Sequence, residues 1–177
     1  MNIFILDKDP KVAARLQCDK HVVKMIVESA QMLSTAHRML DGVETHRMSK
    51  SGKTMTKYWE LPDARESVLY KAVHMGHPCT VWTMICDNNY MWHYDHFSEL
   101  CREYTYRYGK QHKSHTVLLE KIPYDIDLPS IGLTPFPQAM PDEYKGNDPV
   151  MAYRKYYINE KADICTWKNR EVPSWFW

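Results

Sequence analysis

Apolar residues recur at helical spacing through the first forty residues of the chain. Asp9-Pro10 has the pattern of an N-cap followed by proline at the first helical position, and Asp41-Gly42 is a matching stop signal. The pattern predicts an amphipathic helix over about residues 10–40, preceded by a short apolar extended arm at residues 2–6. With about 100° per residue, the apolar face collects Val12, Leu16, Val23, Ile26, Ala30 and Leu33.

The remainder of the chain alternates between helical and irregular patterns. Residues 42–57 are polar and basic, which predicts a mobile loop. Helical patterns follow at about residues 64–75 and 81–108, and Gly109 ends the second. Six prolines between residues 122 and 149 predict a long irregular loop. Asp148-Pro149 repeats the opening cap signal and predicts a last helix to about residue 165.

These patterns predict a mainly α, compact single-domain helical fold over residues 1–177, with a short N-terminal extended arm and a long Pro-rich loop. A chain of 177 residues, 44% hydrophobic and 25% charged, is long enough to bury a core of its own. No apolar run has the length of a membrane span, and no signal-peptide pattern is present. The five cysteines have no paired spacing. We therefore expect a reduced, cytoplasmic protein.

Positive charge and aromatic rings occur together in the second half of the chain. The net charge is only +1, so a basic binding surface must come from local clustering. Residues 101–115 place cations among tyrosines, and the C-terminal part adds a tryptophan with further cations. Cations for phosphates and rings that stack on bases are the ingredients of nucleic-acid binding. The candidate DNA-binding residues are Lys20, Arg102, Arg107, Lys110, Lys113, Trp167, Lys168 and Arg170.

The stretch Cys18-Asp19-Lys20-His21 begins a second group of candidates. On a continuous helix Asp19 falls inside the apolar stripe, where a carboxylate needs a partner or a pocket. His21, Lys24 and Glu28 fall on the other side. This polar strip is either a solvated helix face or the wall of a cleft, in which His21 is an acid or base and Lys24 an anion contact.

Zinc is a further interpretation of the same region. Cys18 and His21 lie three residues apart on one predicted helix, and His77 and Cys79 form a second pair. Two such pairs could complete a tetrahedral site, although their spacing matches no compact zinc module. No cofactor is otherwise expected.

Several short motifs carry a resemblance. They are Gly76-His77 before a helix, the RYG of residues 107–109 at its end, MPDEYKG at residues 140–146, and NEKADICTW at residues 159–167. In this order they resemble, loosely and over about the last 100 residues, the phage pyrimidine-dimer DNA glycosylases of the endonuclease V type. CDKH and TWKNREVP also resemble segments of a phage and bacterial family of unassigned activity.

The resemblance implies a helical domain that grips DNA and reaches a base without a metal. Those glycosylases attack with the N-terminal α-amine, beside a glutamate and an arginine of the first helix. This chain departs from that pattern because Asn2 is too large for routine removal of Met1. In addition, no Arg–Glu pair matches in the first helix. The resemblance therefore supports a helical DNA-binding scaffold more strongly than it supports catalysis by the N-terminal amine.

We therefore expect a DNA-acting enzyme that excises or modifies a base, with the DNA as its partner. Asp19, His21, Lys24 and Glu28 would line the cleft, and His77 would lie across from them. A group transferase in phage thymine hypermodification is an alternative on a related scaffold. Two further alternatives are a non-catalytic nucleic-acid-binding protein and a small zinc-stabilised domain.

Overall fold

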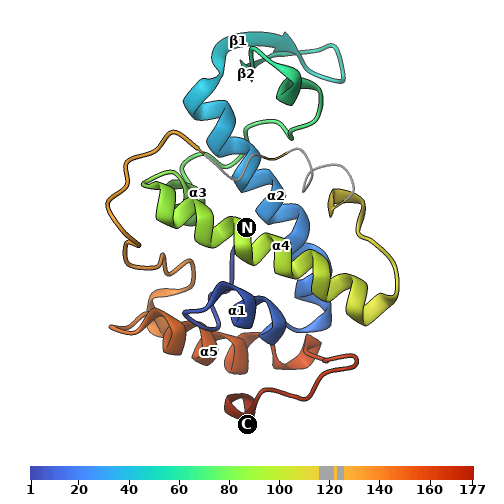
Figure 1. Ribbon diagram of the computed structural model, residues 1–177, viewed down its shortest axis with the longest axis vertical. Helices are drawn as coiled ribbons and strands as arrows, with labels where there is room; N and C mark the ends of the chain where they lie inside the picture. Colours follow the sequence, from blue (N-terminus) through green and yellow to red (C-terminus); the bar gives the residue numbers. More distant parts are fainter. Residues whose placement is uncertain (116–121, 123–125) are drawn as a thin grey trace.

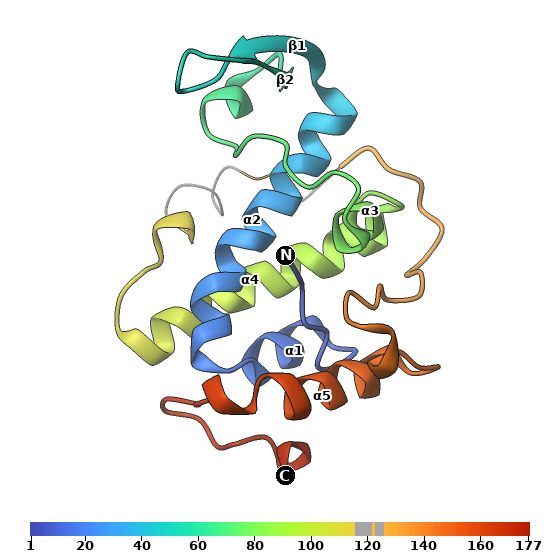
Figure 2. The same cartoon turned by 180° about the vertical axis from the view of Figure 1, so that it is seen from behind.

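Helix α2 (Asp19–Asp41) is the axis of the molecule, as Figure 1 shows. The structure, a computed structural model, describes residues 1–115, 122 and 126–177. Helix α4 (Asp87–Tyr108) crosses α2 and also packs on α1 (Pro10–Leu16). Helix α5 (Pro149–Glu160) lies below them, and a two-stranded sheet lies at the opposite end of α2 (Figures 1 and 2). The described part of the chain is mainly helical, as predicted.

The single helix predicted over residues 10–40 is wrong, because the chain breaks between α1 and α2. Gln17 and Cys18 are extended, with ψ angles of 141° and 164°. The freed backbone N–H of Cys18 donates to the Tyr157 hydroxyl at 3.2 Å, and that of Asp19 donates to the Thr166 carbonyl at 2.8 Å. The break shifts the phase of the helix, so two residues predicted as core, Val12 and Val23, are each 38% exposed.

The mobile loop predicted at residues 42–57 is also wrong. Strands β1 (Val43–Met48) and β2 (Met55–Glu60) form an antiparallel hairpin, in which Met48 pairs with Met55 and Val43 with Glu60. Most of its residues are exposed on both faces. The apolar–polar alternation that reveals a half-buried strand is therefore missing from the sequence.

The predicted helix at residues 64–75 is reduced to one 3-10 turn, η1 (Ala64–Ser67), followed by irregular chain. Helix α3 (Pro78–Thr83) begins directly afterwards, where a break was expected. His77 caps it, since its imidazole accepts from the backbone N–H of Cys79. The short helix thus begins with a side-chain cap and proline, a signal that the helical periodicity alone did not reveal.

The later stop and start signals are confirmed. Gly109 ends α4 in the left-handed conformation at φ 68°, and Asp148 caps α5 through the N–H groups of Val150 and Met151. Short 3-10 turns follow at η3 (Asp142–Tyr144), η4 (Ala162–Ile164) and η5 (Ser174–Phe176). Residues 126–140 form no helix or strand, while residues 123–125 of the predicted Pro-rich loop lie outside the described residues.

The N-terminal arm runs through the core. Ile3, Ile5 and Leu6 are fully buried, and Figure 1 shows the N-terminus at the centre of the molecule beside α2 and α4. The arm is held by side chains rather than by strand pairing, because the Gln17 amide donates to the Ile3 carbonyl at 2.8 Å. In the part of the chain that is described, no helix has the length and apolar character needed to cross a membrane.

Candidate functional site

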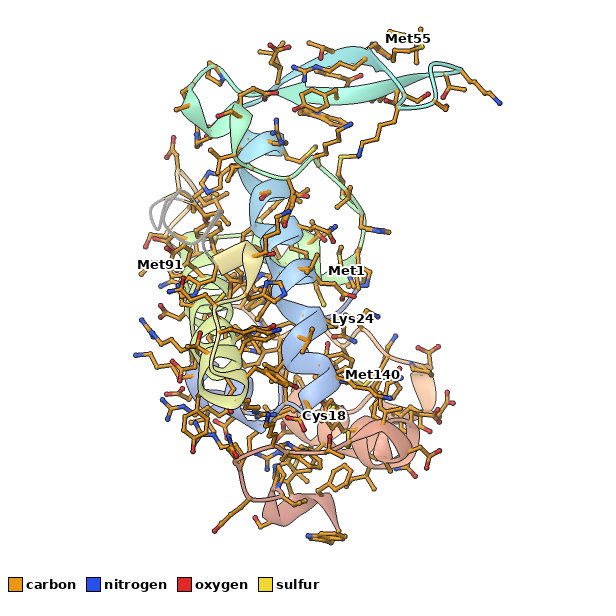
Figure 3. The ribbon with its side chains drawn as sticks, turned by 90° about the vertical axis from the view of Figure 1, so that its right-hand side faces the viewer. Met1, Cys18, Lys24, Met55, Met91 and Met140 are labelled. Carbon is orange, nitrogen blue, oxygen red and sulfur yellow. The ribbon has the colours of Figure 1, made fainter. Side chains whose placement is uncertain are left out.

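A hollow of about 220 Å³ lies beside the N-terminal half of α2, between the N-terminal arm and α5. Figure 3 shows Met1 and Lys24 side by side along α2 in this region, with Met140 nearby. Segments far apart in the sequence build its wall, and polar atoms dominate that wall. We call it the α2 hollow; it is lined by Met1, Asn2, Phe4, His21, Lys24, Met25, Glu28, Ala139, Tyr156 and Lys161.

Glu28 is the acidic group of the α2 hollow. Its carboxylate accepts from the backbone N–H of Asn2 at 2.9 Å and lies 3.7 Å from the amino group of Met1. Lys24, one helical turn earlier, places its ammonium 3.5 Å from the other carboxylate oxygen. The Glu28 side chain is only 12% exposed. Its negative charge is balanced by the ammonium groups of Met1 and Lys24 at the edge of the core.

His21 is fixed in position by its neighbours. Its Nδ1 lies 2.5 Å from the Tyr157 hydroxyl, and its ring stacks on Phe4 at 4.3 Å with an interplanar angle of 13°. Burial raises the pKa of Tyr157 well above its ordinary value, so that hydroxyl keeps its proton and can donate it to Nδ1. His21 is thus held at a set angle beside the hollow, as a catalytic acid or base must be.

Phe4 adopts a strained backbone conformation to reach this place. Its φ of 54° is in the left-handed region, which bulky residues rarely occupy. The Asn2 side chain stabilises the bend, because its carbonyl oxygen accepts from the N–H groups of Ile3 and Phe4. Strain of this kind persists where the surroundings over-determine the backbone, and it is concentrated at functional sites. The bend places the Phe4 ring between His21 and Tyr156.

A second cation and a second ring complete the hollow. The ammonium of Lys161 lies 4.8 Å from the centre of the Tyr156 ring. Lys24, with 69% of its side chain exposed, provides the other ammonium. An anion entering the hollow would meet both cations, and the half-buried Tyr156 would be the aromatic side chain beside it.

Cys18 and Cys165 form a thiol pair next to His21. A hydrogen bond from the Cys165 thiol, together with contact to His21, outweighs burial and lowers the pKa of Cys18 to about 4. The same hydrogen bond, joined by burial, raises the pKa of Cys165. Cys18 is fully buried, behind the histidine that lines the hollow.

The four candidate zinc ligands are not assembled. Cys18 is engaged with Cys165 and His21, while burial raises the pKa of Cys79 to about 12, near Ile3 and Tyr153. Within residues 1–115, 122 and 126–177, no three His, Cys, Asp or Glu side chains are grouped to hold a metal ion. Cys18, His21, His77 and Cys79 therefore do not form one metal site in the described structure.

His77 lies near the hollow without lining it. Its imidazole caps α3, and the electrostatic influence of Glu28 and of the Met1 amino group reaches it. Burial, followed by the positive charges of Met1 and His74, lowers the pKa of His77. It is thus a neighbour of the Met1–Glu28 pair whose positive form is disfavoured by its surroundings.

Asp19 lies outside the α2 hollow and is fully engaged in other contacts. Its carboxylate accepts from Arg107 at 2.9 Å, from the Thr166 hydroxyl at 2.8 Å and from the backbone N–H of Lys168 at 2.9 Å. The prediction that it lines the cleft is therefore wrong. The helix break at Gln17 removes it from the apolar stripe and turns it towards the C-terminal segment.

Several predicted phosphate contacts are also committed elsewhere. Arg107 is 1% exposed and bound to Glu103, Asp19 and the Arg15 carbonyl, so it cannot reach DNA. Trp167 is 9% exposed and donates to the Leu16 carbonyl, which removes it as a base wedge. Partly exposed cations pair with acids: Arg102 with Glu99 and Arg170 with Glu103. The exposed remainder is Lys20, Lys110, Lys113 and Lys168.

The structure thus brings together His21, Lys24 and Glu28 and adds partners that the sequence did not reveal. The residue types of Phe4, Tyr156 and Lys161 are ordinary, and only long-range packing places them at the hollow. Asn2 was noted for its size alone. No protein-family model, curated protein or solved structure matches this chain.

Proposed function

We propose that the protein is an enzyme that binds DNA and acts on a base held at the α2 hollow, by excising the base or modifying it. The observation that carries the proposal is the Glu28 carboxylate, fixed between ammonium groups and beside an oriented His21. The volume of about 220 Å³ is below the roughly 300–1,000 Å³ of drug-sized sites. It suits one small ring rather than a whole nucleotide.

The roles follow from charge and position. Glu28 stabilises positive charge that develops on the reacting sugar or amine, and His21 transfers the proton. The half-buried Tyr156 ring lines the hollow and offers aromatic surface to a base that has left its stack, as enzymes acting on duplex bases require, while Phe4 fixes His21 from behind. Lys24 and Lys161 hold a phosphate of the DNA or an anionic leaving group.

Group transfer to a base, as in thymine hypermodification, is the second candidate. The two ammonium groups favour it, because a departing pyrophosphate needs cations at the reacting centre. Trapping with borohydride identifies excision that uses the Met1 amino group. Excision through the Met1 amino group would pass through an imine, which borohydride reduces to a stable protein–DNA adduct. Group transfer would leave no such adduct.

The first prediction tests the hollow itself. Phage-type modified and unmodified DNA is incubated with the protein and candidate amine donors, and the nucleosides are then measured by mass spectrometry. We expect Glu28→Gln and His21→Ala to lower turnover by about 100-fold or more and to change the Kd for DNA less than about threefold. Gln preserves the hydrogen bond from the Asn2 backbone, so the change removes mainly charge.

Glu143→Gln is the matched control, because Glu143 is exposed and lies outside the hollow. It should retain full turnover. If DNA is bound but no base is altered under any donor, the protein is a non-catalytic binding module. If Glu28→Gln and Glu143→Gln are equally active, Glu28 has no part in the chemistry.

A further inference from the structure

The β1–β2 hairpin concentrates the positive charge of the molecule. Residues 46–57 contain four Lys and Arg and no Asp or Glu. The rest of the chain has 19 Lys and Arg against 22 Asp and Glu, since the totals are 23 and 22, and is therefore net −3. The net charge of +1 is therefore the sum of a segment of +4 at residues 46–57 and a net charge of −3 over the rest of the chain.

The two faces of the hairpin have different environments. One face packs on the body: Arg47 stacks over Tyr58 at 3.7 Å, and the Tyr58 hydroxyl donates to Glu66 at 2.6 Å. Because side chains alternate along a strand, the register places the next residues on the other face. That face consists of Glu44, His46, Met48, Met55, Lys57 and Trp59, and all of these except the half-buried Trp59 are exposed.

The outer end of this face combines an apolar pair with free cations. Met48 and Met55 are cross-strand partners, 57% and 56% exposed. Lys57 pairs with Glu44 at 2.8 Å, and Arg47 pairs with Glu60 and Glu66. In the turn beyond the methionines, Lys50 and Lys53 are exposed and form no ion pair with any described residue. Their charges are therefore open to a ligand.

We propose that the outer part of the β1–β2 hairpin is a groove-binding element for duplex DNA. This rests on the proposed function. A two-stranded ribbon fits the major groove, which is about 12 Å wide. Lys50 and Lys53 contact phosphates beside the groove, and Met48 and Met55 contact thymine methyl groups, the apolar groups that the major groove presents.

Helix α2 sets the distance between this element and the α2 hollow. Figure 3 shows Met55 beyond one end of α2, and Met1 and Lys24 along the half of α2 that lies towards Cys18. Glu28 and Asp41, both in α2, are 13 residues apart, or about 20 Å at 1.5 Å per residue. A duplex along α2 would cover that distance with about six base pairs. The hairpin would therefore grip DNA well away from the reacting base.

The test measures the binding of a fluorescent 20-base-pair duplex at several salt concentrations. We expect the double change Lys50→Gln and Lys53→Gln to weaken binding about tenfold near 0.1 M salt. It should also reduce the slope of log K against log salt by about two. Met48→Ser with Met55→Ser should weaken binding without changing that slope. The control removes two exposed lysines from elsewhere, Lys8→Gln with Lys11→Gln, and should leave the affinity and slope nearly unchanged.

Thermal unfolding checks that each variant is folded. Equal affinity and slope for the hairpin variant and the wild type would overturn the hairpin proposal, whereas base turnover by the wild type would still support the proposed function. Equal weakening by the control pair would also overturn it, since the effect would then be general charge. Tighter binding of RNA or of an acidic protein than of duplex DNA, through the same lysines, would assign the element to that partner instead.

Discussion

At the residue scale, Arg38 and Glu66 show how this small core accommodates charge. Arg38 is 1% exposed, yet each donor group of its guanidinium has an acceptor, including the carbonyls of Trp59, Leu69 and Tyr70. Glu66 accepts from Arg38 at 2.7 Å. A buried guanidinium without an acid would be costly, so this pair keeps the base of the hairpin attached to α2.

Glu66→Gln should therefore destabilise the protein in a pH-dependent way. Burial alone would raise the pKa of Glu66, but hydrogen bonds from Tyr58, Leu61 and Arg38 lower it to about 2. The contribution of its charge to stability is full above about pH 4.5 and is lost as the pH falls towards 2. Urea unfolding at pH 7 should show a loss of about 2 kcal/mol, shrinking between pH 4.5 and pH 2.

Glu60→Gln is the control for that series. Glu60 pairs with Arg47 through a 51% exposed side chain, and exposed pairs contribute little. A difference at pH 7 that persisted unchanged at pH 2 would show that Glu66 acts through packing rather than charge.

At the element scale, the ends of the helices are set by local chemistry. Asp9-Pro10, Asp148-Pro149 and Gly109 each carry a signal within two residues, and each of these boundaries was predictable from the sequence. The break between α1 and α2 was not. Its hydrogen-bond partners, Tyr157 and Thr166, lie more than 130 residues further along the chain. A periodicity of 3.6 residues cannot register a partner at that distance.

Gly109→Ala should test whether the left-handed backbone conformation at Gly109 helps to end α4. Gly109 has a φ of 68°, and a Cβ there would meet nothing within 4 Å, so only backbone strain opposes the change. We expect a loss of about 1 kcal/mol of unfolding free energy, measured by chemical denaturation. Gly146→Ala, also without a neighbour within 4 Å and not in the left-handed region, should be neutral or slightly stabilising. Equal losses at both sites would rule out strain at Gly109 as the cause.

The candidate site likewise has a part that local sequence signals predict and a part that depends on long-range contacts. His21, Lys24 and Glu28 occur within eight residues of one helix, and their shared face was visible in the sequence. Phe4 and Lys161 could not be predicted, since a left-handed bend at residue 4 and the end of α5 meet only in the folded chain. Asp19 was placed wrongly because the helix phase changes two residues before it.

At the scale of the whole molecule, Asp19 attaches the C-terminal segment to the helices. Asp19→Asn should lower the unfolding free energy by about 2 kcal/mol, because it weakens charged hydrogen bonds to Arg107, Thr166 and Lys168. Residues 165–177 should then be cleaved faster in limited proteolysis. Asp163→Asn, at an exposed position of the same region, is the control and should leave the cleavage rate unchanged.

The same variant separates anchoring from chemistry. Since Asp19 lies outside the α2 hollow, turnover per folded molecule should remain within about threefold of the wild type. A loss of turnover as large as that expected of Glu28→Gln, in a protein with normal cleavage kinetics, would show that Asp19 takes part in the proposed reaction.

The buried Arg107 also bears on how the chain folds. Its guanidinium joins the Arg15 carbonyl of α1, Asp19 of α2 and Glu103 of α4, and Glu103 in turn holds Arg170. A chain that extends only to the end of α4 contains these charged residues but lacks Arg170, the cation that pairs with Glu103. The charges of this cluster are balanced only when the C-terminal segment packs on α4, so we expect that segment to complete the fold after the helices have met.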